Sequence, residues 1–143
     1  MTLRALLCAA MLLPMSAFAD SQLTAEAWIP TAPPMAMSHA AYVTLHNTDA
    51  VPRVLTGVSS QTYAMSHLHE SKEASGMATM SMLHQIEIPA GETLTMQPGG
   101  LHIMLMSPKS PVAEGDSVML TLSFANGETL TVNAMVKARD YGS

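Results

Sequence analysis

The sequence has little of several residue types on which common activities depend. Its 143 residues contain one cysteine, so no internal disulfide, Cys-x-x-Cys redox pair or cysteine-based zinc site can form. Charged residues make up only 12% of the chain, and the net charge is −5. The chain therefore lacks the basic surface that nucleic-acid binding requires. Its length suits one domain with a core and is too short for two ordinary ones.

Residues 1–19 are predicted to be a cleavable secretory signal peptide. Arg4 precedes an apolar run over residues 5–13, and Ala17-Phe18-Ala19 supplies the small residues that precede a cleavage point. Cleavage before Asp20 would leave residues 20–143 as a single domain in the periplasm.

A stable membrane anchor is not expected. A transmembrane helix needs roughly 18 apolar residues, and Pro14 and Ser16 interrupt the N-terminal run too early. Cys8 follows Leu7, where a lipoprotein signal would have a small residue. Removal of residues 1–19 would also remove this cysteine, so any site in the mature protein must work without a thiolate.

The remaining chain has the pattern of an all-β fold. Short segments alternate apolar and polar residues and are separated by proline and glycine, as in an antiparallel sandwich or barrel. The clearest pair is 118–124 and 130–136, joined by Asn126-Gly127, for which a type I′ turn is predicted. No segment has a long helical period with caps. Further strands are predicted at 22–29, 40–47, 53–59, 63–70, 77–88, 92–97 and 101–106.

Histidine and methionine are abundant, with six and fourteen copies, and they cluster on three predicted strands. Residues two apart in a strand lie on one face, about 6.6 Å apart along the chain. Each of the three strands has such a face. These faces carry Met65, His67 and His69, then Met80 and Met82, then His102, Met104 and Met106.

Taken singly, each of these residues is more often structural, because methionine fills irregular cores well. Their clustering in a chain without a thiolate favours a metal site. Neutral, polarizable thioether sulfur suits Cu(I) and is a poor ligand for Mg²⁺, Ca²⁺ or Zn²⁺. Iron–sulfur and blue-copper centres need cysteine and are excluded. No catalytic triad can be defended, since the carboxylates lie mostly at turns, so an enzyme is not expected.

The spacing of four of these residues resembles the motif of the periplasmic copper chaperone family known as the PCuAC domain. That motif is a His, ten residues, a Met, twenty-one residues and then His-x-Met. Here His69 is followed by ten residues and Met80, then by twenty-one residues and His102-Ile103-Met104. The segments AAYVTLHN at 40–47 and QPGGLHIMLM at 97–106 are similar to the family as well.

The resemblance implies a cupredoxin-like Greek-key β-sandwich that binds one Cu(I) through His69, Met80, His102 and Met104. It also implies a monomer that delivers copper to an acceptor protein, such as the CuA centre of cytochrome c oxidase subunit II or a Sco-type thiol protein. Copper buffering or tolerance is the alternative role. A metal-independent interaction module is a third possibility.

Several other residues have metal-ligand character outside this motif. Met35, Met37 and His39 fall in a proline-led loop, whose alternative role is an apolar plug. Met65, His67, Met82 and Met106 are expected to assist or shield the ion. The sequence gives His46 and His84 structural roles.

Overall fold

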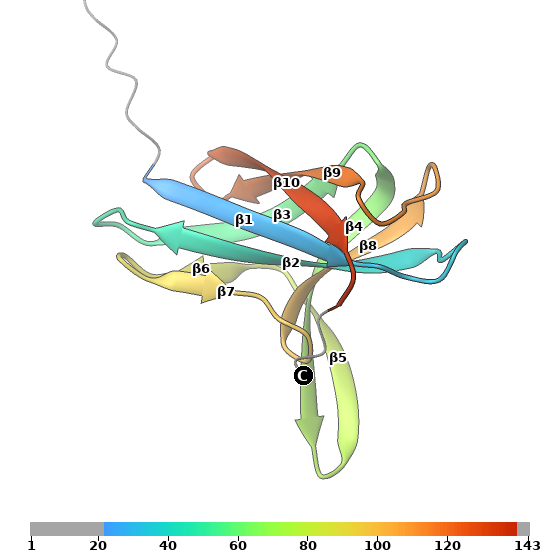
Figure 1. The fold of residues 1–143 in the computed structure, drawn as a ribbon. Helices are drawn as coiled ribbons and strands as arrows, with labels where there is room; N and C mark the ends of the chain where they lie inside the picture. Colours follow the sequence, from blue (N-terminus) through green and yellow to red (C-terminus); the bar gives the residue numbers. More distant parts are fainter. Residues whose placement is uncertain (1–21, 140–143) are drawn as a thin grey trace, which may run out of the picture.

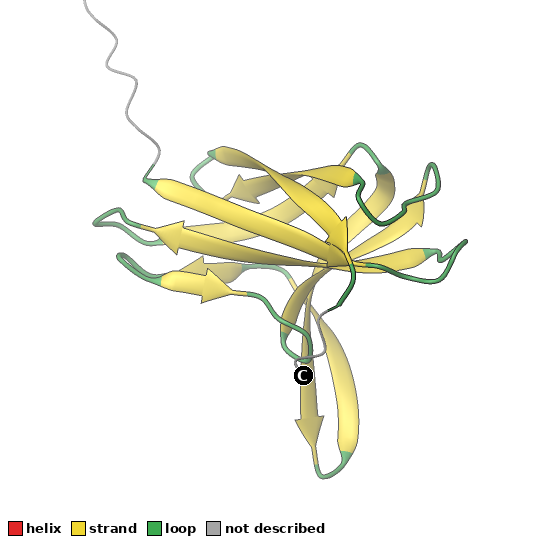
Figure 2. Cartoon of the chain, in the orientation of Figure 1, coloured by secondary structure: helices red, strands yellow, loops and turns green. Residues whose placement is uncertain are grey.

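The computed structural model describes residues 22–139, which form ten β-strands and no helix (Figure 1 and Figure 2). The predicted all-β fold is confirmed. None of the described residues forms a helix with the length and hydrophobicity of a membrane span. The predicted signal peptide and its cleavage point lie outside the described residues. The strands are β1 (Leu23–Pro30), β2 (Ser38–Asn47), β3 (Arg53–Ser60), β4 (Tyr63–Ala74), β5 (Met77–Leu83), β6 (Ile86–Ile88), β7 (Thr93–Thr95), β8 (Leu101–Pro108), β9 (Ser117–Phe124) and β10 (Thr129–Lys137).

The strands hydrogen-bond in the order β5-β4-β8-β2-β1-β10-β9-β3-β6, and β7 pairs with β2. The strand β2 lies within this path and joins its two parts, β5-β4-β8 and β1-β10-β9-β3-β6. Its residues 38–41 pair with β8, and residues 42–47 pair with β1. The path curls, because β3 and β4 are far apart in the order yet contact one another. This curl encloses the core.

The core is made by the alternating apolar residues that the sequence pattern selects. On β9, Val118, Leu120, Leu122 and Phe124 are buried, while the residues between them are more exposed. Leu45 on β2 and Leu105 on β8 are fully buried in the same cluster. Burial of a leucine side chain contributes roughly 1.5–3 kcal/mol, so such faces fix which side of each strand points inward.

Three details differ from the sequence-based prediction. The sheet is mixed, because β1 runs parallel to β10 while the other pairs are antiparallel. The strand predicted at 77–88 is two strands, since the chain bends at His84-Gln85 and β6 leaves β5 to pair with β3. The predicted type I′ turn is wrong. Only Gly127 has a positive φ, of 86°, and its N–H bonds to the Phe124 carbonyl in a type I turn with a bulge.

The outer parts of β4 and β5 project from the body of the sheet as a hairpin (Figure 1). All of β5 except Leu83 is exposed, and so is β4 from Lys72 onward. The turn at the tip uses Ser75 and Gly76, both with positive φ. Three strands therefore meet at the base of this hairpin in the order β5-β4-β8, and these strands carry the predicted histidine and methionine faces.

Candidate metal centre

All four predicted ligands lie on one face of the β5-β4-β8 segment. His69 on β4 stands directly opposite His102 on β8. Met104 lies two residues further along β8, opposite His67. Met80 on β5 lies opposite Ser71, two residue pairs from His69 toward the hairpin tip. Residues paired directly across antiparallel strands point to the same face. The two histidines thus form a central pair, and a methionine lies on each side of it along the strands.

The two central imidazoles have a separation that suits a shared ion. The ring centroids of His69 and His102 are 5.7 Å apart, and the ring planes are tilted by 59°. An ion bound at about 2 Å from one nitrogen of each ring would hold the two centroids roughly 6 Å apart. The rings can therefore approach one ion with little movement of the backbone.

His102 is held in a fixed orientation by the backbone. Its side chain is 5% exposed, and its Nδ1 lies 3.0 Å from the Gly100 carbonyl oxygen. A carbonyl can only accept a hydrogen bond, so Nδ1 carries the proton and donates it. The lone pair then stays on Nε2. Metal-bound histidines are commonly oriented by a hydrogen bond of this kind.

His69 has a buried ring nitrogen without a partner. Its Nδ1 is inaccessible to solvent and makes no hydrogen bond. Burial lowers the pKa of the His69 imidazole, and the nearby His102 and His67 lower it further. A lowered pKa favours the neutral ring, which is the form that can bind a metal ion. The chemistry of this donor set therefore fits a metal ion.

Met80 can reach the central pair, whereas Met82 is obstructed. Met80 lies diagonally across from His69, because the residue opposite Met80 on β4 is the small Ser71, two positions beyond His69. Met82 lies directly opposite His69, on the side away from β8, so the His69 ring stands between Met82 and His102. Met80 is 53% exposed and flexible, and it can lean over Ser71 toward the two rings.

The donors around this centre are neutral. Glu70 points to the opposite face from its neighbour His69 and pairs with Lys72 at 3.0 Å. Within residues 22–139, no three His, Cys, Asp or Glu side chains gather in a group that could hold a metal. A site here must depend on thioethers as well as imidazoles. Neutral ligands leave the positive charge of a bound ion uncompensated, which favours release.

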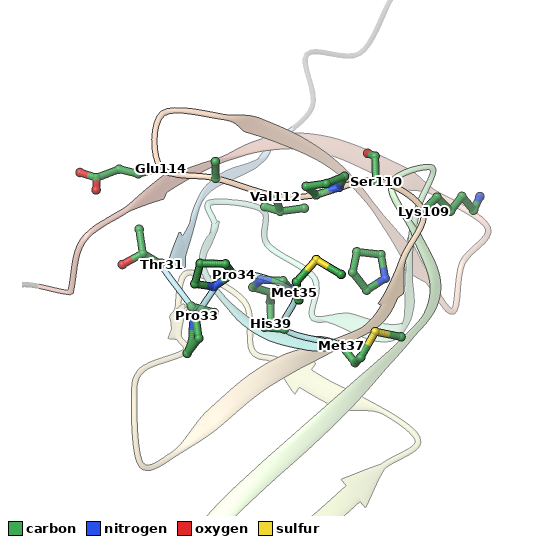
Figure 3. A pocket seen from close by; sticks show the side chains of 15 residues that line it. Thr31, Pro33, Pro34, Met35, Met37, His39, Lys109, Ser110, Val112 and Glu114 are labelled. Atoms are coloured by element: carbon green, nitrogen blue, oxygen red, sulfur yellow. The ribbon is translucent and has the colours of Figure 1, made fainter.

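Met35, Met37 and His39 lie away from this centre. They line a pocket of about 560 Å³ between residues 31–37 and residues 108–114 (Figure 3). None of the four motif residues lines this pocket. His39 is 6% exposed, and its ring packs edge-on against Tyr63 with centroids 5.6 Å apart. The structure thus separates the proline-led loop from the motif face.

The buried His39 is expected to make the apoprotein less stable in mild acid. Burial lowers its pKa, while an unfolded histidine takes up a proton near pH 6.5. Below about pH 6.5 the unfolded chain binds more protons than the folded one, so the free energy of unfolding falls as pH decreases toward the folded pKa. Urea denaturation between pH 7.5 and 5.5 should show a smaller fall for His39→Gln. An equal fall in the wild-type protein and in His39→Gln would contradict this expectation. The control variant is His46→Gln, because His46 is a half-buried histidine whose Nδ1 lies 3.0 Å from the Thr93 hydroxyl.

Comparison with known proteins agrees with the sequence motif. The family model of LpqE-like putative lipoproteins matches residues 24–136. The chain belongs to this family. A related member is the putative lipoprotein Lxx21020 of Leifsonia xyli subsp. xyli, 35% identical over 120 residues, which are 83% of this chain and 71% of that protein. The term lipoprotein belongs to those names, and Cys8 lies outside the described residues.

Solved structures that resemble this chain include PCuAC domains, as the sequence resemblance predicts. The solution structure of CuI-DR1885 from Deinococcus radiodurans is 36% identical, covers 87% of this chain and 84% of its own, and has a TM-score of 0.67. The apo PCuAC domain from PmoF1 is 19% identical, covers 85% and 98%, and has a TM-score of 0.69. At 19% identity, the likeness to the PmoF1 domain shows a shared fold alone.

Proposed function

We propose that this protein is a periplasmic metallochaperone that binds one Cu(I) through His69, Met80, His102 and Met104. The observation that carries the proposal is the geometry of the motif face. The His69 and His102 rings lie 5.7 Å apart, and the Nδ1 of His69 is buried without a partner. The predicted signal peptide supports export, with residues 20–143 as the mature domain.

The donor set selects a soft, monovalent ion. Two thioethers and two imidazoles match the preferences of Cu(I), and harder cations prefer oxygen ligands. The name of CuI-DR1885, a protein 36% identical to this chain, supports the same ion. A methionine site also suits an oxidising compartment, where paired thiols would form a disulfide.

Copper would leave this site by exchange of ligands, without catalysis, and this protein is not an enzyme. Met80 is 53% exposed on a projecting hairpin, whereas His102 is 5% exposed and anchored to Gly100. We therefore expect an acceptor to displace the thioether of Met80 first and the imidazole of His102 last. The ion stays Cu(I) throughout, so no electron is transferred.

Anaerobic titration of Cu(I) into residues 20–143, in competition with a chromophoric chelator, tests the proposal. We expect a tight first equivalent, because the two imidazoles already stand 5.7 Å apart and share one face with both thioethers. Failure to compete with the chelator would contradict the proposal, since the methionine face would then be a packing surface.

The recipient is proposed from the resemblance to PCuAC domains. It is the CuA centre of cytochrome c oxidase subunit II, supplied by a monomeric chaperone directly or through a Sco-type thiol protein. Periplasmic copper buffering is the second candidate, because it needs the same site. A metal-independent interaction module would not explain why histidines and methionines cluster on one face of these strands.

Oxidase activity distinguishes delivery from buffering. Deletion of this protein is expected to lower cytochrome c oxidase activity in cells grown at low copper and to have little effect at high copper. Normal oxidase activity at low copper, together with sensitivity to excess copper, would instead support buffering.

A further inference from the structure

A second group of soft donors lies beside the motif face and takes no part in the proposed site. His67, Met82 and His84 together line a cavity of about 230 Å³. The opposite wall of this cavity is residues 56–58 of β3. None of the four motif residues lines the cavity, so its donors are separate from theirs.

Strand pairing explains why these three side chains meet. The last residue pair of the β4–β5 ladder is Leu68 with Leu83. His67 and His84 are the residues that lie next to this pair, beyond the end of the ladder. The chain bends at His84 and turns toward β6, which leaves this end of the ladder open. Met82 precedes the bend by two residues and lies on the same face as His67.

We propose that His67, Met82 and His84 form a second Cu(I) position next to the first. The inference rests on the proposed function, since it assumes the same ion. Two imidazoles and one thioether are a neutral, soft donor set of the kind that favours Cu(I). Within residues 22–139 no hydrogen bond to another side chain or to the backbone occupies the ring nitrogens of His67 or His84. Both rings are therefore free to bind an ion.

The two positions are close enough for an ion to pass between them. The rings of His67 and His69 are stacked, with centroids 6.3 Å apart and planes 28° from parallel. Met82 lies directly opposite His69, on the side away from His102, and also lines the cavity, so an ion that leaves His69 meets this thioether next. Two cations this close repel one another, and the second ion should bind at least about tenfold more weakly than the first.

Anaerobic Cu(I) titration of residues 20–143 against chelators of two strengths tests this position. The wild-type protein should take up a tight first equivalent and a weaker second one. His84→Ala and Met82→Leu should each lose the second equivalent and keep the first. Met80→Leu should weaken the first equivalent at least about tenfold and leave the donors of the second intact.

Matched controls separate a site from a change in packing. His84 and Met82 are both exposed, so their replacement should preserve the fold. His46→Ala removes a histidine elsewhere on the sheet, and Met119→Leu removes a methionine that is 51% exposed, against 52% for Met82. Both controls should keep two equivalents. In NMR spectra, the first equivalent of Cu(I) should shift the imidazole nitrogen resonances of His69 and His102. The second equivalent should shift those of His67 and His84.

Each other outcome is decisive. A single equivalent in the wild-type protein, unchanged by His84→Ala, would overturn the second position and leave the proposed function standing. A second equivalent that survives the double replacement of Met82 and His84 would overturn the assignment of its ligands. No tight equivalent at all would overturn the proposed function and this inference with it.

Discussion

The double replacement His69→Ala/Met104→Ala is expected to weaken the first Cu(I) equivalent by more than about a hundredfold, or about 2.8 kcal/mol. It removes one imidazole and one thioether from the same face. His102 would keep its hydrogen bond to Gly100, but only Met80 would remain to share an ion with it. Competition between the protein and a chromophoric chelator under anaerobic conditions measures the change directly.

The control for this variant has the same composition change at another place. His46→Ala/Met119→Ala removes one histidine and one methionine that lie outside the β5-β4-β8 segment. It should bind the first equivalent as the wild-type protein does. If the control and the His69/Met104 variant lost affinity equally, copper binding would depend on overall methionine and histidine content and not on this face.

The sequence was sufficient to predict that these histidines and methionines share one face, because strand periodicity is a local property. One alternating series of donors ends at His69 and another begins at His102, and alternation alone places the members of each series on one side. The motif spacing selects four members, and the register brings the two histidines opposite one another. Burial of Leu68 and Ile103 on the other face holds that register, since a slip by one residue would invert both strands.

Apart from the hairpin of β9 and β10, which was predicted, the partners of the strands could not be, because such pairing depends on contacts between residues far apart in the chain. Nothing local to residues 77–88 indicates that β6 leaves β5 for β3, yet that departure creates the bend at His84. The prediction of a structural role for His84 therefore did not include its position with His67 in the lining of one cavity. The parallel pairing of β1 with β10 was missed for the same reason.

The arrangement separates the stable part of the molecule from the part proposed to handle copper. The core between the curled strands consists of residues such as Leu45 and Leu120, which are fully buried. The hairpin of β4 and β5 extends beyond it and exposes Met80 and Met82. An exposed hairpin can adjust to an acceptor while the body of the sheet stays fixed, which suits ligand exchange between proteins.

Replacing Asn47 with alanine is expected to lower the free energy of unfolding by about 3 kcal/mol. Asn47 is 1% exposed at the end of β2. Its Nδ2 donates to the carbonyls of Val51, Ile88 and Pro89 at 3.0, 3.1 and 3.2 Å. One side chain thus ties β2 to the following turn and to the end of β6. Urea denaturation of the apoprotein measures the loss.

The loss should be large because alanine leaves three carbonyl groups without this donor, and the Ile88 bond is buried where water has little access to replace the amide. Asn133→Ala is the control, since Asn133 is exposed on β10, and it should change stability by less than about 0.5 kcal/mol. Equal effects of the two variants would mean that the Asn47 bonds contribute nothing beyond their counterparts in water. The ligand strands β4, β5 and β8 lie outside this network, so Asn47→Ala should keep its Cu(I) affinity at temperatures where it remains folded.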